Sequence, residues 1–127
     1  MRRPRAAIPW SAGRARHRAE YRSWMASAAW LGHRRACAER WAEAHGAEPV
    51  CQVCGAPWSL RHGDLHHRSY ARLGHEADMD LLPLCRLCHG QVHRVLESSR
   101  GWLCLGREAA TDQVVARLRA KRGYGSA

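Results

Sequence analysis

Two pairs of cysteines constrain this chain more than any other feature of its sequence. Cys51 and Cys54 form one C-x-x-C motif, and Cys85 and Cys88 form a second. Each spacing lets two sulfurs converge on one ion from a tight turn, and four thiolates complete a tetrahedral zinc site. A chain of 127 residues forms one domain with a modest core, which such a site would supplement. We therefore expect a structural zinc ion with no open position for catalysis.

The rest of the sequence favours metal over disulfides for these cysteines. Residues 1–5 (MRRPR) lack the apolar core of a secretory signal, and no stretch approaches the roughly 20 apolar residues of a membrane span. We therefore expect a cytoplasmic protein without membrane contact, in which thiols stay reduced and bind metal. Cys37 and Cys104 stand alone and are expected to be small buried hydrophobes.

The formal net charge of +10 comes almost entirely from arginine, since Lys121 is the only lysine. The planar guanidinium group can bind a phosphate through two donors, and excess positive charge suits a polyanionic partner. A GC-rich genome would also enrich arginine and alanine together. Of these two explanations, the composition favours a nucleic-acid partner bound mostly through its phosphate backbone.

The chain divides into four segments. The sequence predicts a basic flexible arm over 1–14, a helical lead-in over 15–45, a core with both cysteine pairs over 46–98, and a C-terminal extension over 99–127. The lead-in is expected to be one long helix with a break near Gly32, and Thr111 is a plausible N-cap for the last helix. The other predicted elements are the strands of a β-hairpin around 58–60 and 65–67, and helices over 88–98 and 111–122.

Histidines gather between and just after the cysteine pairs. His89 and His93 are four residues apart on a predicted helix, so both project from one face and can grip one ion. His66 and His67 alternate across a predicted strand, so one can bind metal while the other addresses water. Asp80 lies between the two groups. Any one of these residues could be an ordinary surface or capping residue, but their joint pattern predicts a second, catalytic site.

This pattern resembles a known family of enzymes. The segments LHHRSYARLGHE (65–76) and DLLPLCRLCH (80–89), followed by His93, resemble the His-Asn-His (HNH) endonucleases of bacteria and their phages. The segment WMASAAW (24–30) is similar to a helical lead-in that some members carry. The resemblance implies an α+β fold: a small ββα-metal core stapled by a four-cysteine zinc, flanked by a long N-terminal helix and a C-terminal helix. It also implies a metal-dependent hydrolase that cuts DNA, encoded by a bacterium or a phage.

The resemblance assigns roles residue by residue. His67 occupies the position of the general base, and His89 is the final histidine of the motif. His66 occupies the preceding, metal-binding position. His93 matches a further ligand found in colicin-type nucleases, so His66, His89 and His93 would hold one catalytic ion and leave a position open. Three imidazoles suit zinc, nickel or manganese better than magnesium, which prefers oxygen ligands.

Asp80 stands where the family has its asparagine, and the sequence leaves its role open. An asparagine donates and accepts hydrogen bonds, whereas an ionised aspartate only accepts. Asp80 could orient the loop that holds the base, pair electrostatically with His67, or approach the metal. We favour the orienting role and count Asp80 with His67 and His89 as catalytic residues.

Arginines near the motif are candidates for contacts with DNA phosphates. The first choice is Arg94, and the others are Arg68, Arg86 and Arg72. Any one of them could instead face solvent, since arginine is frequent throughout the chain.

Two other functions compete with an endonuclease. A non-catalytic zinc-finger module that binds DNA would need the cysteines and the basic charge, but not the histidines or Asp80. An accessory subunit of a phage packaging or recombination complex would use the tryptophan-rich helix as a surface for a protein partner or a second copy of the chain. The surplus of histidines favours the enzyme.

Overall fold

The structure, a computed structural model, describes the backbone of residues 10–123 and the side chains of residues 17–123. Its elements are α1 (Trp10–Met25), α2 (Ala28–His45), β1 (Gly63–His67), a 3₁₀ turn η1 (Asp78–Asp80), β2 (Leu81–Cys85), α3 (Arg86–Leu96), α4 (Arg100–Cys104) and α5 (Arg107–Arg122). The fold is therefore α+β, with one small sheet. Within this described part, no helix combines the length and apolar character that crossing a membrane requires.

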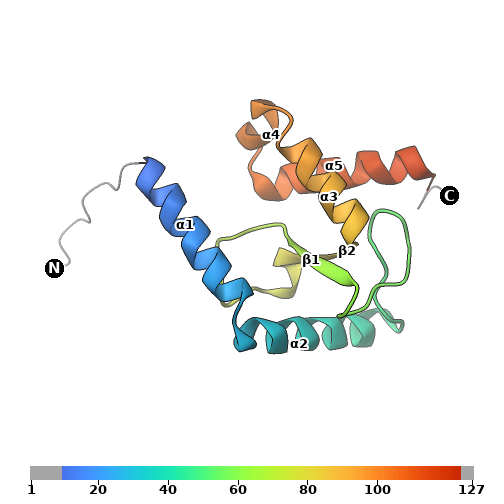
Figure 1. Cartoon of the computed structure of the whole chain (residues 1–127). Helices are drawn as coiled ribbons and strands as arrows, with labels where there is room; N and C mark the ends of the chain where they lie inside the picture. Colours follow the sequence, from blue (N-terminus) through green and yellow to red (C-terminus); the bar gives the residue numbers. More distant parts are fainter. Residues whose placement is uncertain (1–9, 124–127) are drawn as a thin grey trace.

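The sheet separates two layers of helices. β1 and β2 pair antiparallel, with Leu65 opposite Pro83. Figure 1 shows α2 on one side of the two strands and α3 with α5 on the other. Each side has its own core. The α2 side buries Trp30, Cys37, Trp58, Leu65 and Leu81, and the α3–α5 side buries Cys51, Val53, Leu84, Cys88, Val92, Leu96, Ala110, Val114 and Val115.

Strand alternation decides which layer each residue of β1 meets. Successive side chains of a strand point to opposite faces. Leu65 belongs to the core on the α2 side, whereas the next residue, His66, packs against His89 of α3. His67 returns to the α2 side, where its ring stacks on Trp30. The side chains of these two adjacent histidines therefore pack in different layers of the protein.

The predicted hairpin is wrong in one strand. Residues 65–67 do form a strand, but their partner is β2 and not the segment around 58–60, which lies in turns and loop. Pro83 makes β2 difficult to predict from the sequence. Proline has no backbone N–H to donate to a neighbouring strand, so it usually argues against a strand. A two-stranded sheet consists only of edges, where proline is tolerated. The carbonyl oxygen of Pro83 accepts a hydrogen bond from the backbone of Gln52 at 3.0 Å.

The helix boundaries also differ from those predicted. The lead-in breaks before α2 and not near Gly32, because the Ser27 hydroxyl caps α2 by accepting from the Trp30 amide at 3.1 Å. Of the predicted arm, residues 1–9 lie outside the described part of the chain, and 10–14 belong to α1. At the other end α5 begins at Arg107, so Thr111 lies inside the helix and is no N-cap.

Two tryptophans of the lead-in, Trp24 and Trp30, contribute to the core on the α2 side. Trp30 is buried in the core on the α2 side, and Trp24 packs against that core. The indole nitrogen of Trp24 donates to Glu76 at 2.9 Å, which ties α1 to the loop after β1. Packing therefore uses these two indoles, in the role that their helical spacing favours over an exposed partner surface.

We expect Gly63→Ala to destabilise the protein by about 1–3 kcal/mol, because the added Cβ would overlap the indole ring of Trp58. That ring is held in place by a 2.8 Å hydrogen bond from its Nε1 to the carbonyl oxygen of Asp64. Gly32→Ala is the matched control: it lies in α2 with open space around it and should be neutral or stabilising. Denaturant unfolding of both variants measures the difference, and equal stabilities would contradict the prediction.

Candidate metal centres and catalytic residues

Four cysteine sulfurs lie close together between the start of α3 and the turn after residue 50. The sulfurs of Cys51, Cys54, Cys85 and Cys88 all lie within 4.8 Å of one another. Those of Cys54 and Cys85 are 3.9 Å apart. A tetrahedron of sulfurs at about 2.3 Å from zinc has edges of about 3.8 Å. The cluster can therefore hold a metal ion such as zinc, as the sequence spacing predicts.

Local backbone structure presents both cysteine pairs. After Cys51 the chain turns back, with the Gly55 amide donating to the Cys51 carbonyl at 2.8 Å. Gly55 has a φ of 75°, a left-handed conformation that favours glycine. Cys85 caps α3, and its Sγ accepts from the amide of Cys88 at 3.4 Å. Each pair is thus presented by its own tight turn, and the amide of Gln52 joins the first turn to Pro83 of β2.

Three histidines meet between β1 and α3. Candidate ligand atoms of His66, His89 and His93 lie within 4.8 Å of one another. The Nε2 atoms of His89 and His93 are 2.9 Å apart, and the His66 ring stands edge-on to both, with centroids 5.3 and 5.2 Å away. His89 and His93 are one turn apart on α3, and His66 faces them from β1. This histidine cluster can hold one metal ion through three imidazole nitrogens.

Two further side chains orient these rings. Oδ2 of Asp64 lies 3.0 Å from Nδ1 of His89, which turns the His89 Nε2 toward the cluster. The Thr111 hydroxyl of α5 lies 3.0 Å from Nε2 of His66. The other ring nitrogen, Nδ1 of His66, is buried without a hydrogen-bond partner. Metal-binding histidines usually have their second nitrogen held in this way, so the donor set fits an ion.

Burial keeps His66 in the form that binds metal. Desolvation, together with the positive charge of Arg107, lowers the pKa of His66 to about 2. Burial also lowers the pKa of His93. A neutral imidazole offers a lone pair to a metal ion, whereas a protonated one does not.

His67 lies apart from the histidine cluster and pairs with a carboxylate. Its Nε2 is 2.8 Å from Oε2 of Glu76, and the side chains are 2% and 0% exposed. Rings of Trp30 and Tyr70 stack on it, each 5.3 Å away. Glu76 also accepts hydrogen bonds from Trp24 and from the amide of Gly74 at 2.7 Å.

The charge states of this pair follow from its surroundings. Burial lowers the pKa of His67 in spite of the opposing effect of Glu76. Although burial raises the pKa of Glu76, hydrogen bonds from His67 and Trp24 lower it overall. An ionised carboxylate only accepts, so the Nε2 of neutral His67 is the donor. The other nitrogen, Nδ1, then carries the lone pair.

Asp80 is buried away from the histidine cluster. Its carboxylate accepts from Nε and Nη2 of Arg72 and from the Ala77 amide, the last at 2.9 Å. Its backbone oxygen accepts from the amide of Arg68 at 2.7 Å. The hydrogen bond from Arg72 lowers the pKa of Asp80, in opposition to burial. Of the three roles that the sequence left open, these contacts match the ordering of the loop between the strands. The carboxylate that pairs with His67 is Glu76.

Two of the arginines predicted to contact phosphate are engaged by carboxylates. Arg68 donates to both oxygens of Asp112, at 2.9 and 2.7 Å, and to the carbonyl oxygen of Met79. Arg72 pairs with Asp80. Both guanidinium groups thus connect parts of the fold.

The other two predicted arginines are exposed. Arg86 is 66% exposed and lies 3.9 Å from a carboxylate oxygen of Asp64, close to the histidine cluster. Arg94 lines a shallow pocket between α3 and α5 together with Leu118 and Arg122. Arg94 therefore lies on a different side of α3 from His93.

Sequence reasoning missed four side chains that surround the histidines. Glu76 stands within the motif and could have been noticed as the only carboxylate between His67 and Asp78. Asp64 lies two residues before His66, so strand alternation could have predicted that both side chains point to the same face of the sheet. Thr111 and Arg107 come from α5, far along the chain, and no spacing rule links them to the histidines.

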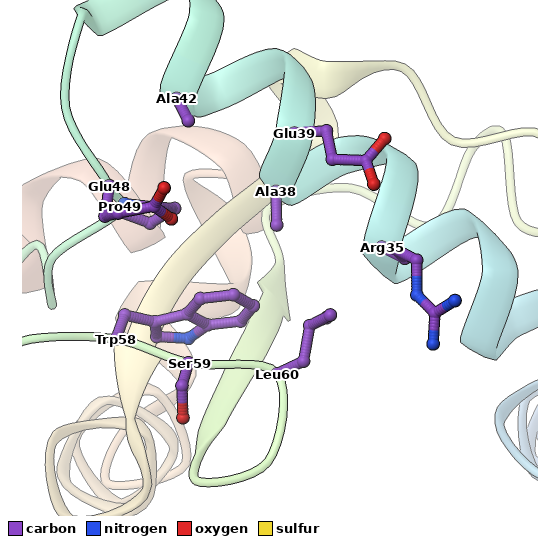
Figure 2. Close-up of a pocket in the computed structure, with 9 residues that line it drawn as sticks. All are labelled: Arg35, Ala38, Glu39, Ala42, Glu48, Pro49, Trp58, Ser59 and Leu60. Carbon is purple, nitrogen blue, oxygen red and sulfur yellow. The ribbon is translucent and has the colours of Figure 1, made fainter.

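Two of the cavities beside α2 differ in how close they lie to the histidine cluster. One of about 440 Å³ lies beside the histidine cluster and is lined in part by Trp30, Arg34, Asp64 and His89. The other, of about 520 Å³, is shown in Figure 2, where Trp58 lies below Ala38 of α2. None of the residues that line this second cavity belongs to the cysteine or histidine clusters. Of these two cavities, the first gives a ligand room next to the candidate metal site.

Comparison with known proteins adds no relative to this description. No family model matches the chain, and neither the curated proteins nor the solved structures against which it was compared include a match. Its function is therefore inferred from its residues and their geometry.

Proposed function

We propose that this protein is a metal-dependent endonuclease of the HNH type, which hydrolyses phosphodiester bonds in DNA. The observation that carries the proposal is the convergence of His66, His89 and His93, with Asp64 and Thr111 orienting two of the rings. A purely structural role would not require three histidines to face one point next to a separate cysteine cluster. The net charge of +10 supports a polyanionic substrate.

The two clusters would hold ions with different tasks. Four cysteines leave no open position, so zinc there would stabilise the fold. Three histidines leave a position open, and zinc, nickel or manganese suits them better than magnesium. A divalent ion bound by the histidine cluster would neutralise a phosphate oxygen and stabilise the departing 3′ oxygen.

His67 is the proposed general base. Its Nε2 donates to Glu76, so its Nδ1 is free to take a proton from the attacking water. The water oxygen would then bond to phosphorus as the bond to the 3′ oxygen breaks. The departing oxygen would take a proton from solvent, which leaves a 5′-phosphate and a 3′-hydroxyl. Glu76 would hold the imidazole in one tautomer and stabilise the imidazolium that forms, as an orienting carboxylate does for other catalytic histidines.

A plasmid-nicking assay tests the proposal. Purified protein should convert supercoiled plasmid to nicked or linear DNA when manganese, nickel or zinc is added, and should lose this activity with a chelator too weak to strip the cysteine site. Ends should carry 5′-phosphate, which a ligase can reseal. If the protein binds DNA but no metal supports cutting, the endonuclease proposal fails. The protein would then be a zinc-finger module or an accessory subunit.

A further inference from the structure

Arg107 begins α5 and lies beside the strand that carries the histidines. Its Nε donates to the carbonyl oxygen of His67 at 2.7 Å, and its guanidinium carbon lies 4.3 Å from the centre of the Tyr70 ring. Thr111 follows four residues later and contacts Nε2 of His66. Residues four apart on a helix share a face, so Arg107 and Thr111 both face the end of β1. Arg107 is thus fixed next to the histidine cluster from outside the motif.

The positive charge of Arg107 has no carboxylate partner among the residues that the structure describes. By contrast, Arg40, Arg68, Arg72 and Arg86 each lie within 4 Å of a carboxylate oxygen. The terminal nitrogen Nη2 of Arg107 is buried and has no hydrogen-bond partner. Buried donors are nearly always paired, because removing a charged group from water without a partner is costly. An anion bound at this point would supply the missing partner.

We propose that Arg107 binds a phosphate oxygen of the DNA backbone at the histidine cluster. The identification of the anion as a phosphodiester rests on the proposed nuclease function, whereas the anion site itself rests on Arg107. Its Nε bond to His67 and its stacking on Tyr70 hold the guanidinium plane, which leaves the terminal nitrogens, Nη2 among them, as donors for the ligand. Arg107 would therefore contact the substrate, while Arg68 and Arg72 hold the fold together.

Arg107→Ala tests this assignment against Arg117→Ala, which removes the same charge from an exposed position of the same helix. For nicking, kcat/KM should fall by about 10- to 100-fold in Arg107→Ala and by less than about 3-fold in Arg117→Ala. Added guanidinium ion at millimolar concentration should restore part of the activity of Arg107→Ala alone. Arg107→Lys keeps the charge and most of the packing, and should lie between wild type and Arg107→Ala. Zinc content and the thermal midpoint identify variants that keep their fold.

Binding of inorganic phosphate provides a second measurement that does not depend on cutting. It is followed by NMR shifts of the protein with zinc at the cysteines and no further metal. Phosphate should shift signals around Arg107 in wild type and in Arg117→Ala, but much less in Arg107→Ala or, if that variant unfolds, in Arg107→Lys. If phosphate binds in this way but wild type cuts no DNA, the anion site stands and the nuclease proposal fails. If wild type cuts DNA but phosphate binds folded Arg107 variants as well as wild type, the anion site is wrong and the nuclease proposal stands.

Discussion

Cys88→Ser should unfold the protein and release its tightly bound metal. Wild type should contain about one zinc ion per chain that survives dialysis, held by the four cysteines. Zinc binding to such a site contributes about 10 kcal/mol or more, which is comparable to the whole stability of a small domain. Cys88 is also buried in the core between the sheet and the helices α3 and α5. Metal analysis and circular dichroism of the purified variant measure both effects.

Cys104→Ser is the matched control for that experiment. The expectation that Cys104 is buried is wrong: it is an exposed free thiol at the end of α4 and lies outside the cysteine cluster. The same substitution there should leave the zinc content and the thermal midpoint unchanged. A Cys88→Ser protein that stays folded without zinc would show that the cysteine cluster is not a structural metal site.

His67→Gln should lower the rate of DNA cleavage by roughly 10²-fold or more, while DNA affinity stays within a few-fold. Glutamine is chosen because its amide nitrogen can still donate to Glu76, as Nε2 of His67 does. An alanine would leave the buried Glu76 without this partner and would destabilise the fold. The assay could then not separate loss of catalysis from loss of folded protein. The amide has no basic nitrogen, so it cannot accept the proton of the attacking water. Single-turnover nicking rates and DNA-binding curves separate the two quantities.

Variants of other histidines distinguish the base from the metal ligands. His89→Ala removes a ligand, so it should lower both metal affinity and cleavage, and excess metal should partly restore cutting. Excess metal should not restore His67→Gln. His62→Ala, at an exposed position before β1, is the control and should cut like wild type. Equal nicking rates for wild type and His67→Gln with every metal would mean that His67 is a packing residue and not the base.

Local geometry explains which features could be predicted from the sequence alone. Each C-x-x-C spacing by itself puts two sulfurs on one tight turn, so the cysteine cluster could be predicted from the sequence. The same holds for His89 and His93, which are one helical turn apart wherever the helix lies. Strand alternation likewise separates His66 from His67, and the structure has them in different layers.

Only the tertiary structure decided which side chains meet across loops. β1 pairs with β2 and not with the segment before it, because burying Leu65 together with Leu81 outweighs the poor strand propensity of Pro83. The loop between these strands brings Glu76, and not Asp80, to His67. Packing of α5 against α3 likewise brings Arg107 to the histidines, whereas Arg94 faces a different groove. Such pairings depend on how apolar faces pack over the whole chain, and the spacing of residues within one segment carries no information about them.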